Sequence, residues 1–135
     1  AYGTKVVVRT LDTPQGPVEY WRRIRVLVTS YSPSTAGPSP SASNFGITRS
    51  GKRATVGMIA VDPSVIPMGT RMYVPGYGMG SAEDTGSAII GRHIDVCYDD
   101  HNLVHWRRWV DVYLLTPVPP ESSIRYVLPN WPPER

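Results

Sequence analysis

The sequence predicts a small, mainly β domain, a barrel with one short helix and long loops. Three observations indicate this fold class. Twelve glycines and 14 prolines interrupt the chain too often for long helices. Runs rich in β-branched and aromatic residues recur between these breaks. The length of 135 residues, with 41% hydrophobic and 19% charged residues, suits one globular domain with its own core.

Six runs are expected to form strands, because each combines β-branched or aromatic residues with turn residues near its ends. In chain order they cover residues 5–10 (KVVVRT), 24–30 (IRVLVTS), 70–74 (TRMYV), 88–90 (AII, the shortest), 93–98 (HIDVCY) and 109–116 (WVDVYLLT). A helix is expected only from residue 99 or 100 to about 106, where an aspartate is suited to cap the first turn.

Two segments outside these runs are expected to be extended. Residues 32–43 (SPSTAGPSPSAS) consist largely of Ser, Pro and Ala, which predicts a long surface loop, either disordered or one wall of a binding groove. Residues 117–135 contain six prolines and are expected to pack over the barrel as an extended tail.

Charge and cysteine content argue against several classes of function. The net charge is only +3, and the arginines form short clusters (22–25 and 107–108) with no extended basic stripe, which disfavours nucleic-acid binding. No apolar run reaches the roughly 20 residues of a membrane helix. The sequence shows no signal peptide, and a start at Ala1 would fit processing of a longer chain. The single Cys97 cannot form an internal disulfide and is expected to be a small buried residue.

The histidines do not predict a metal site. His101 and His105 are four residues apart, a spacing that suits zinc ligands on one helix face, but no third ligand matches and surface positions are favoured. His93 shares a strand face with Asp95 and either lies near a site there or is an ordinary exposed histidine. No cofactor is expected.

Three aspartates in apolar surroundings are the candidate site residues. Alternation along residues 93–98 places Asp95 on one face with Cys97. Asp111 shows the same local pattern, so alternation alone leaves both as exposed strand carboxylates. Asp62 precedes a proline and Asp84 precedes Thr-Gly, positions at which a strand gives way to a turn and can present a side chain to a groove.

Taken together, the three aspartates belong to an ordered set of short motifs. The motifs are VTSYS at 28–32, ITRSG at 47–51, AVDP at 60–63, IPMGT at 66–70, AEDTG at 82–86 and GRHID at 91–95. Spacings of 22 and 11 residues separate Asp62 from Asp84 and Asp84 from Asp95. In these features residues 25–115 resemble the 3D domain family, which is named for its three aspartates.

The resemblance implies a six-stranded double-psi β barrel over residues 25–116, preceded by an N-terminal extension (1–24) and followed by the tail (117–135). It implies a relationship to the catalytic domain of membrane-bound lytic transglycosylase A. In that group the last aspartate is the catalytic acid, which here is Asp95. Asp84 would tune it and bind sugar hydroxyls, and Asp62 would hold the site by hydrogen bonds. The other motif residues expected to bind substrate are Tyr31, Thr48, Ser50, Gly69, Thr70, Thr85 and Gly86.

The resemblance further implies a bacterial protein, secreted or associated with the cell wall, that cuts the β-1,4 bond between MurNAc and GlcNAc in peptidoglycan. It is expected to act as a monomer on glycan strands, without nucleic acid or insertion into a membrane. Such cleavage requires a carboxylic acid that is still protonated near working pH, and burial or a second carboxylate can raise the pKa of an Asp in this way. A glycoside hydrolase on the same barrel and a non-catalytic, expansin-like wall-binding module remain as alternatives. The three aspartates could also hold a hard cation.

Overall fold

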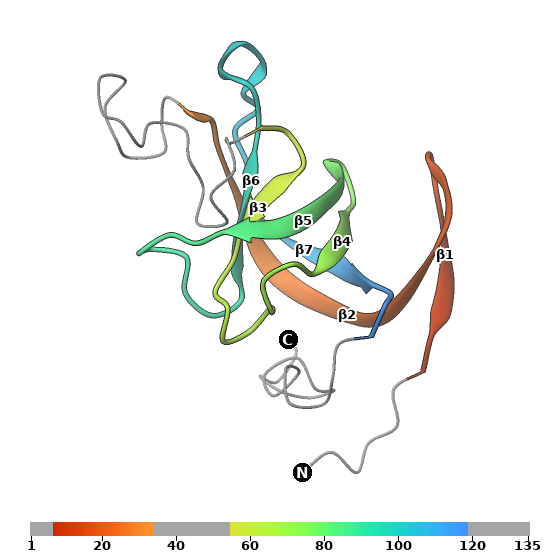
Figure 1. Cartoon of the computed structure of the whole chain (residues 1–135). Coiled ribbons are helices and arrows are strands. Elements are labelled where there is room, and N and C mark those ends of the chain that lie inside the picture. Colours follow the sequence, from red (N-terminus) through yellow and green to blue (C-terminus); the bar gives the residue numbers. More distant parts are fainter. Residues whose placement is uncertain (1–6, 34–54, 119–135) are drawn as a thin grey trace.

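The computed structural model describes residues 7–33 and 55–118, and within them seven strands form one sheet that curls into a barrel (Figure 1). The elements are β1 (Arg9–Thr13), β2 (Gly16–Tyr31), β3 (Met58–Ala60), β4 (Arg71–Val74), β5 (Gly78–Asp84), β6 (His93–Cys97), the 3-10 helix η2 (Asp100–Asn102) and β7 (Arg107–Leu115). The strand order is β1-β2-β6-β3-β5-β4-β7, and a further pairing of β7 with β2 closes six strands into a ring. The predicted mainly β, six-stranded barrel is confirmed.

The long strand β2 belongs to two parts of the molecule. Its first five residues pair antiparallel with β1, which forms a hairpin outside the ring. The register shifts between Tyr20 and Arg22, and beyond this point β2 pairs with β7 and then also with β6. Figure 1 shows the hairpin reaching away from the ring. The sequence predicted only the barrel part of β2, although the turn residues TPQG at 13–16 are a hairpin signal.

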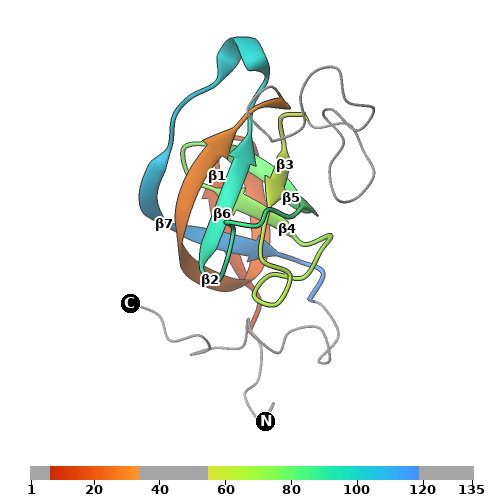
Figure 2. The ribbon, with the colours of Figure 1, turned by 90° about the vertical axis from the view of Figure 1, so that its left-hand side faces the viewer.

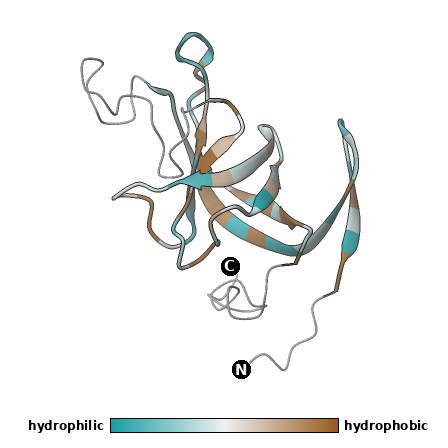
Figure 3. Ribbon diagram, in the orientation of Figure 1, coloured by the Kyte–Doolittle hydropathy of each residue, from teal (hydrophilic) through white to brown (hydrophobic). Residues whose placement is uncertain are grey.

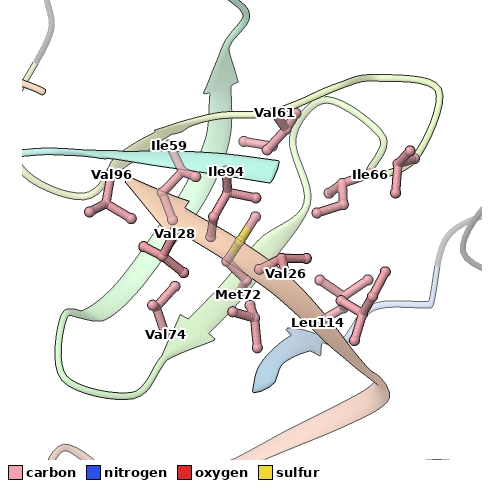
Figure 4. Close-up of a cluster of buried hydrophobic side chains, with 14 of the residues drawn as sticks. Val26, Val28, Ile59, Val61, Ile66, Met72, Val74, Ile94, Val96 and Leu114 are labelled. Carbon is pink, nitrogen blue, oxygen red and sulfur yellow. The ribbon is translucent and has the colours of Figure 1, made fainter. Parts of the chain in front are cut away.

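Alternate residues of the strands fill the inside of the barrel. Ile24, Val26 and Val28 of β2 have no exposed surface, whereas the residues between them are partly exposed. This alternation gives β2 its bands of teal and brown in Figure 3. The largest fully buried side chains are all apolar (Figure 4): Ile24, Ile59, Ile66, Met72, Ile94, Leu114, Val26, Val28, Val61, Val74, Val96 and Val112. Burying each such side chain stabilises the fold by roughly 1.5–3 kcal/mol.

A second, smaller apolar cluster lies on the outer face of the sheet. Ile59 and Val96 belong to the inner core, while their strand neighbours Ala60 and Cys97 belong to the second cluster. Successive residues of a strand point to opposite faces, which explains this division. Ile89, in the loop after β5, packs onto the same outer cluster. The predicted burial of Cys97 is confirmed, since it has no exposed surface.

The sequence prediction was wrong for several short elements. Residues 88–90 form no strand; their apolar side chains lie in the loop between β5 and β6, where only Ile89 is buried. The expected helix is reduced to the three residues of η2, and Asp99 makes no side-chain capping hydrogen bond there. The strands β3 and β5 were missed. Gly80 of β5 carries no β signal, yet a side chain is disfavoured there because a Cβ would lie 2.9 Å from the backbone oxygen of Gly57.

Several expectations fall outside the described residues. These are the structure of most of the loop at 32–43, the packing of the tail beyond residue 118, and the placement of Thr48 and Ser50. Within residues 7–33 and 55–118, no helix has the length and hydropathy needed to span a membrane.

Candidate active site

The site is built on a row of paired residues that crosses four neighbouring strands. Thr29 of β2 pairs with Asp95 of β6. Asp95 also pairs with Ala60 of β3, which pairs on its other side with Asp84 of β5. Figure 2 shows β2, β6 and β3 side by side, as this pairing requires. Residues paired across strands project to the same face, so two strand spacings, roughly 10 Å between Cα atoms, separate the two aspartates.

A pocket of about 310 Å³ opens over this row. Its lining residues are Tyr31, Ala60, Asp84, Thr85, Gly86, Ser87, Ala88, Ile89 and Asp95. The methyl group of Ala60 leaves open the space between the carboxylates of Asp84 and Asp95. The loop after β5 provides one wall, held down by Ile89 in the outer apolar cluster. A volume of this size lies at the lower end of the range of small-ligand sites.

Asp95 is partly buried and is held by a neighbouring hydroxyl. The Oγ1 atom of Thr29 donates a hydrogen bond of 2.9 Å to its Oδ1 atom. Burial raises the pKa of Asp95 above its ordinary value, the hydrogen bond from Thr29 and the charge of His93 oppose that rise, and the charge of Asp84 adds to it. Burial prevails, so this carboxyl group retains its proton to higher pH than a solvated aspartate.

Asp84 receives hydrogen bonds from two sides. The N–H of Thr85 donates to Oδ1 at 2.9 Å, and the hydroxyl of Tyr31 donates to Oδ2 at 3.3 Å. Burial, together with the nearby Cys97 and Asp84, raises the pKa of the Tyr31 phenol. Tyr31 therefore remains a protonated donor at any physiological pH. These contacts fix the Asp84 carboxylate at the rim of the pocket.

Asp62 is not among the residues that line the pocket. Its Oδ1 accepts hydrogen bonds from the N–H and the hydroxyl of Ser64, and its Oδ2 accepts one of 2.7 Å from the N–H of Gly91. Gly91 has a φ of +71°, which favours glycine at this bend before β6. Burial acts to raise the pKa of Asp62, but these hydrogen bonds outweigh it and lower the pKa. These hydrogen bonds tie the turn at Ser64 to the bend at Gly91.

The structure brings some predicted substrate-binding residues together and places others elsewhere. Tyr31, Thr85 and Gly86 line the pocket. Gly69 and Thr70 do not: the N–H of Gly69 donates to the carbonyl of Ala82, and the Thr70 hydroxyl donates to the carbonyl of Pro67. Both residues shape the turn that leads into β4.

Sequence reasoning missed three parts of the site. Thr29 was quoted within the VTSYS motif but was not assigned a role, although alternation puts it on the same face as Tyr31. Ala60 gave no signal, because its importance comes from its place between two carboxylates. Ser87, Ala88 and Ile89 contribute pocket wall as part of a loop, although residues 88–90 were predicted to form a strand.

Asp111, His101 and His105 are not among the residues that line the pocket. Asp111 pairs with Arg25 at 3.1 Å, and both side chains are more than 40% exposed, as the surface reading of Asp111 predicted. His101 and His105 are exposed. Among the described residues, no group of three or more His, Cys, Asp or Glu side chains is arranged to hold a metal ion.

The short motifs, the pairing of their aspartates and the closed barrel together identify the family. The model of the 3D domain matches this chain at residues 57–116, which contain all three aspartates. Residues 57–116 are a 3D domain. The match includes every strand of the ring except β2, which supplies Thr29 and Tyr31 to the site.

The chain is similar to two proteins of Bacillus subtilis (strain 168). The chain is 42% identical over 79 residues, 56% of its length, to the cell wall-binding protein YocH. It is 37% identical over 106 residues, 78% of its length, to YabE, which is named for a proposed role in cell wall shaping. The chain spans about a quarter of the length of each, 25% of YocH and 24% of YabE.

Proposed function

We propose that this 3D domain acts on the bacterial cell wall as a lytic transglycosylase, which cuts the β-1,4 bond between MurNAc and GlcNAc in peptidoglycan strands. The relatives named for cell wall binding and cell wall shaping support the wall as its site of action. The observation that carries the catalytic part is Asp95: a partly buried carboxyl group with a raised pKa that opens into a pocket beside a second carboxylate.

In the proposed reaction, Asp95 acts first as acid and then as base. Its carboxyl proton moves to the glycosidic oxygen as the bond from that oxygen to C1 of MurNAc breaks, which releases the GlcNAc hydroxyl. The Asp95 carboxylate then takes the proton of the C6 hydroxyl of the same MurNAc, and that oxygen bonds to C1 to form the 1,6-anhydro ring. The proton returns to Asp95, so one residue completes the cycle without water.

Asp84 supports this reaction by charge and by contact. Its negative charge adds to the rise of the Asp95 pKa and favours the protonated acid. Because Tyr31 and Thr85 fix its orientation, its carboxylate can accept hydrogen bonds from sugar hydroxyls at a defined place. The positive charge that develops at C1 in the transition state is stabilised by a nearby carboxylate.

Hydrolysis is the first alternative, because two carboxylates on one pocket are also the equipment of a glycoside hydrolase. Inverting hydrolases keep their carboxyl groups about 6.5–9.5 Å apart to admit a water molecule. Asp84 and Asp95 line the same pocket, one on each side of Ala60, which is the kind of arrangement that such a mechanism needs.

Binding without cleavage is the second alternative, supported by the name of the cell wall-binding relative YocH. A binding module would use the same pocket to accept glycan hydroxyls on Asp84 and Asp95. It would not depend on the proton of Asp95, so an amide at this position would preserve much of the affinity.

The deciding experiment is mass spectrometry of purified peptidoglycan after incubation with the protein. Anhydro-muropeptides indicate a transglycosylase, new reducing ends indicate a hydrolase, and unchanged glycan with protein retained on the pellet indicates a binder. Asp95→Asn should lower the release of products by at least about 100-fold, the usual contribution of a general acid. Asp111→Asn, at a surface carboxylate of the same barrel, is the matched control and should leave release unchanged.

A further inference from the structure

A chain of hydrogen bonds links the candidate acid to a histidine that lies outside the pocket lining. The Oγ1 atom of Thr29 lies 2.9 Å from Oδ1 of Asp95 and 2.9 Å from Nε2 of His93. The three residues lie on the outer face of two adjacent strands. Thr29 pairs with Asp95, and Leu27, two residues earlier and therefore on the same face of β2, pairs with His93. One hydroxyl thus bridges two titratable side chains.

We propose that His93 is a positioning residue that acts through Thr29 to set the orientation and the protonation of Asp95. This inference rests on the proposed function for its catalytic consequence, but the coupling itself is a physical property of the folded domain. A histidine is suited to such a role because its charge ordinarily changes between pH 5 and 8.

The chemistry of a hydroxyl gives the chain a direction. When Asp95 is ionised it can only accept, so Thr29 donates its proton to Oδ1 and its lone pair accepts from the Nε2–H of His93. When Asp95 is protonated it donates to Thr29, whose own proton then turns to another acceptor. That acceptor is Nε2 of a neutral His93 or the carbonyl of Ile94, which lies 3.3 Å from the same hydroxyl.

The two arrangements differ by a balanced proton transfer. Charged His93 can pass its Nε2 proton to the oxygen of Thr29 while the Thr29 hydroxyl proton moves to Oδ1 of Asp95. The product is a neutral imidazole, an intact threonine and a protonated Asp95. No other reactant is needed. The charged imidazolium and carboxylate become two neutral groups.

Other charged and titratable groups surround this chain and must be considered with it. They are Tyr31 of β2, Asp84 of β5, Cys97 of β6, Arg92 before β6 and Arg107 of β7, which pairs with Thr29. Asp84 opposes ionisation of Asp95, whereas the two members of the chain, Thr29 and His93, favour it. Removal of either partner should therefore shift the titration of Asp95 upward.

The test is the titration of Asp95 in the folded protein, followed by the carbon NMR shift of its carboxyl group. Thr29→Val keeps the β-branched shape and removes the hydroxyl, His93→Phe removes the imidazole, and the double variant closes a cycle. We expect each single variant to raise the titration midpoint. Because His93 acts through Thr29, the double variant should show a shift clearly smaller than the sum of the two single shifts. Additive shifts would overturn the inference.

Conservative variants separate this coupling from a general loss of structure. Thr29→Ser retains the hydroxyl and should restore the midpoint of the unmodified protein. His93→Gln retains an N–H donor but cannot titrate, so it should preserve orientation while removing any second inflection from the Asp95 curve. His105→Gln, at an exposed histidine, is the matched control and should change nothing. A midpoint in Thr29→Ser equal to that of Thr29→Val would contradict the role of the hydroxyl.

The outcome is independent of whether the domain cleaves glycan. If Asp95→Asn were to retain full wall activity, the proposed function would fail while the NMR coupling could still stand. If Asp95→Asn were inactive but the two shifts added, the function would stand and the inference on His93 would fail. In an active enzyme that needs Asp95 protonated, the pH profile of Thr29→Val should move to higher pH on its alkaline limb, in step with the NMR midpoint.

Discussion

Asp84 and Asp95 lie on the two strands that flank β3, and each is paired with the same residue of that strand, Ala60. This register places two carboxylates on one face with only a methyl group between them. A pocket forms because no larger side chain fills the gap, and a carboxyl group lines it on each side.

Asp95 is expected to lower the stability of the fold at neutral pH. Burial raises its pKa in the folded state, so the folded protein binds this proton more tightly than the unfolded chain, whose value is near 3.9. The resulting stability is fully present below the unfolded pKa and is lost as pH rises through the folded pKa. Asp95→Asn should therefore raise the melting temperature at pH 7 and change it much less at pH 3.5.

Thermal unfolding at the two pH values measures this difference. Asp111→Asn is the control, since its exposed ion pair with Arg25 should contribute less than about 1 kcal/mol at either pH. An equal change in melting temperature for Asp95→Asn at pH 3.5 and pH 7 would show that burial does not govern its ionisation.

Asp62 is expected to stabilise the fold in the opposite pH range. Its folded pKa is lowered by hydrogen bonds, so its contribution is present above the unfolded value and is lost as pH falls through the folded value. Asp62→Ala leaves the N–H groups of Ser64 and Gly91 without their acceptor. The cost should be about 1–3 kcal/mol in the free energy of unfolding, measured by urea denaturation at pH 7.

Ser64→Ala provides the comparison for that measurement. It removes one of the hydrogen bonds to Asp62 and leaves the contact with Gly91 in place, so its cost should be smaller. Equal free energies of unfolding for Asp62→Ala and the unmodified protein would contradict the stabilising role of the Asp62 hydrogen bonds.

Ala60 is expected to control access to the space between the two carboxylates. Only 3% of its surface is exposed, and it lies in the lining of the pocket. Ala60→Leu should fill that space and abolish binding and cleavage of peptidoglycan, at a cost in stability of about 1–3 kcal/mol from overpacking. Pull-down and digestion assays on the folded variant give the readout. Ala60→Ser, which adds one oxygen atom, should retain both activities, and a fully active Ala60→Leu would argue for a site elsewhere.

Cys97 is expected to be inert in the folded protein. Burial raises the pKa of its thiol to about 11, with the charges of Asp99, Asp84 and Asp95 adding to the rise and a hydrogen bond from Tyr31 opposing it. The thiolate fraction at pH 8 is then more than about 100-fold below that of an ordinary cysteine. Reaction with a disulfide reagent at pH 8 should be slower by at least that factor than in urea. Equal rates in the two conditions would mean that the outer apolar cluster opens readily.

Local pattern was sufficient where a residue's position depends on its own strand. The residue type of Cys97 predicted its burial, and alternation along β6 predicted that Cys97 shares a face with Asp95. It also predicted a surface position for Asp111. The period of two along a strand is a property of the chain itself, so it can be read without knowledge of the neighbouring strands.

Local pattern failed where a strand is made by its neighbours. The strand β5, GMGSAED, is rich in small residues and has little β propensity, yet it forms because β3 and β4 supply hydrogen bonds on both sides. The apolar residues at 88–90 had the stronger local signal, but they serve as a loop that covers the outer cluster. Propensity was overruled in both cases by pairing and packing.

The sequence by itself determined the fold class, the two faces of β6, and the ordered motifs that mark the 3D domain. Only the tertiary structure decided that Thr29, Asp95, Ala60 and Asp84 form one row, because this row depends on a parallel pairing of β2 with β6 and on the insertion of β3 between β6 and β5. Strand order and register are contacts between residues far apart in the chain. They are selected by the closure of the whole barrel, which no single segment encodes.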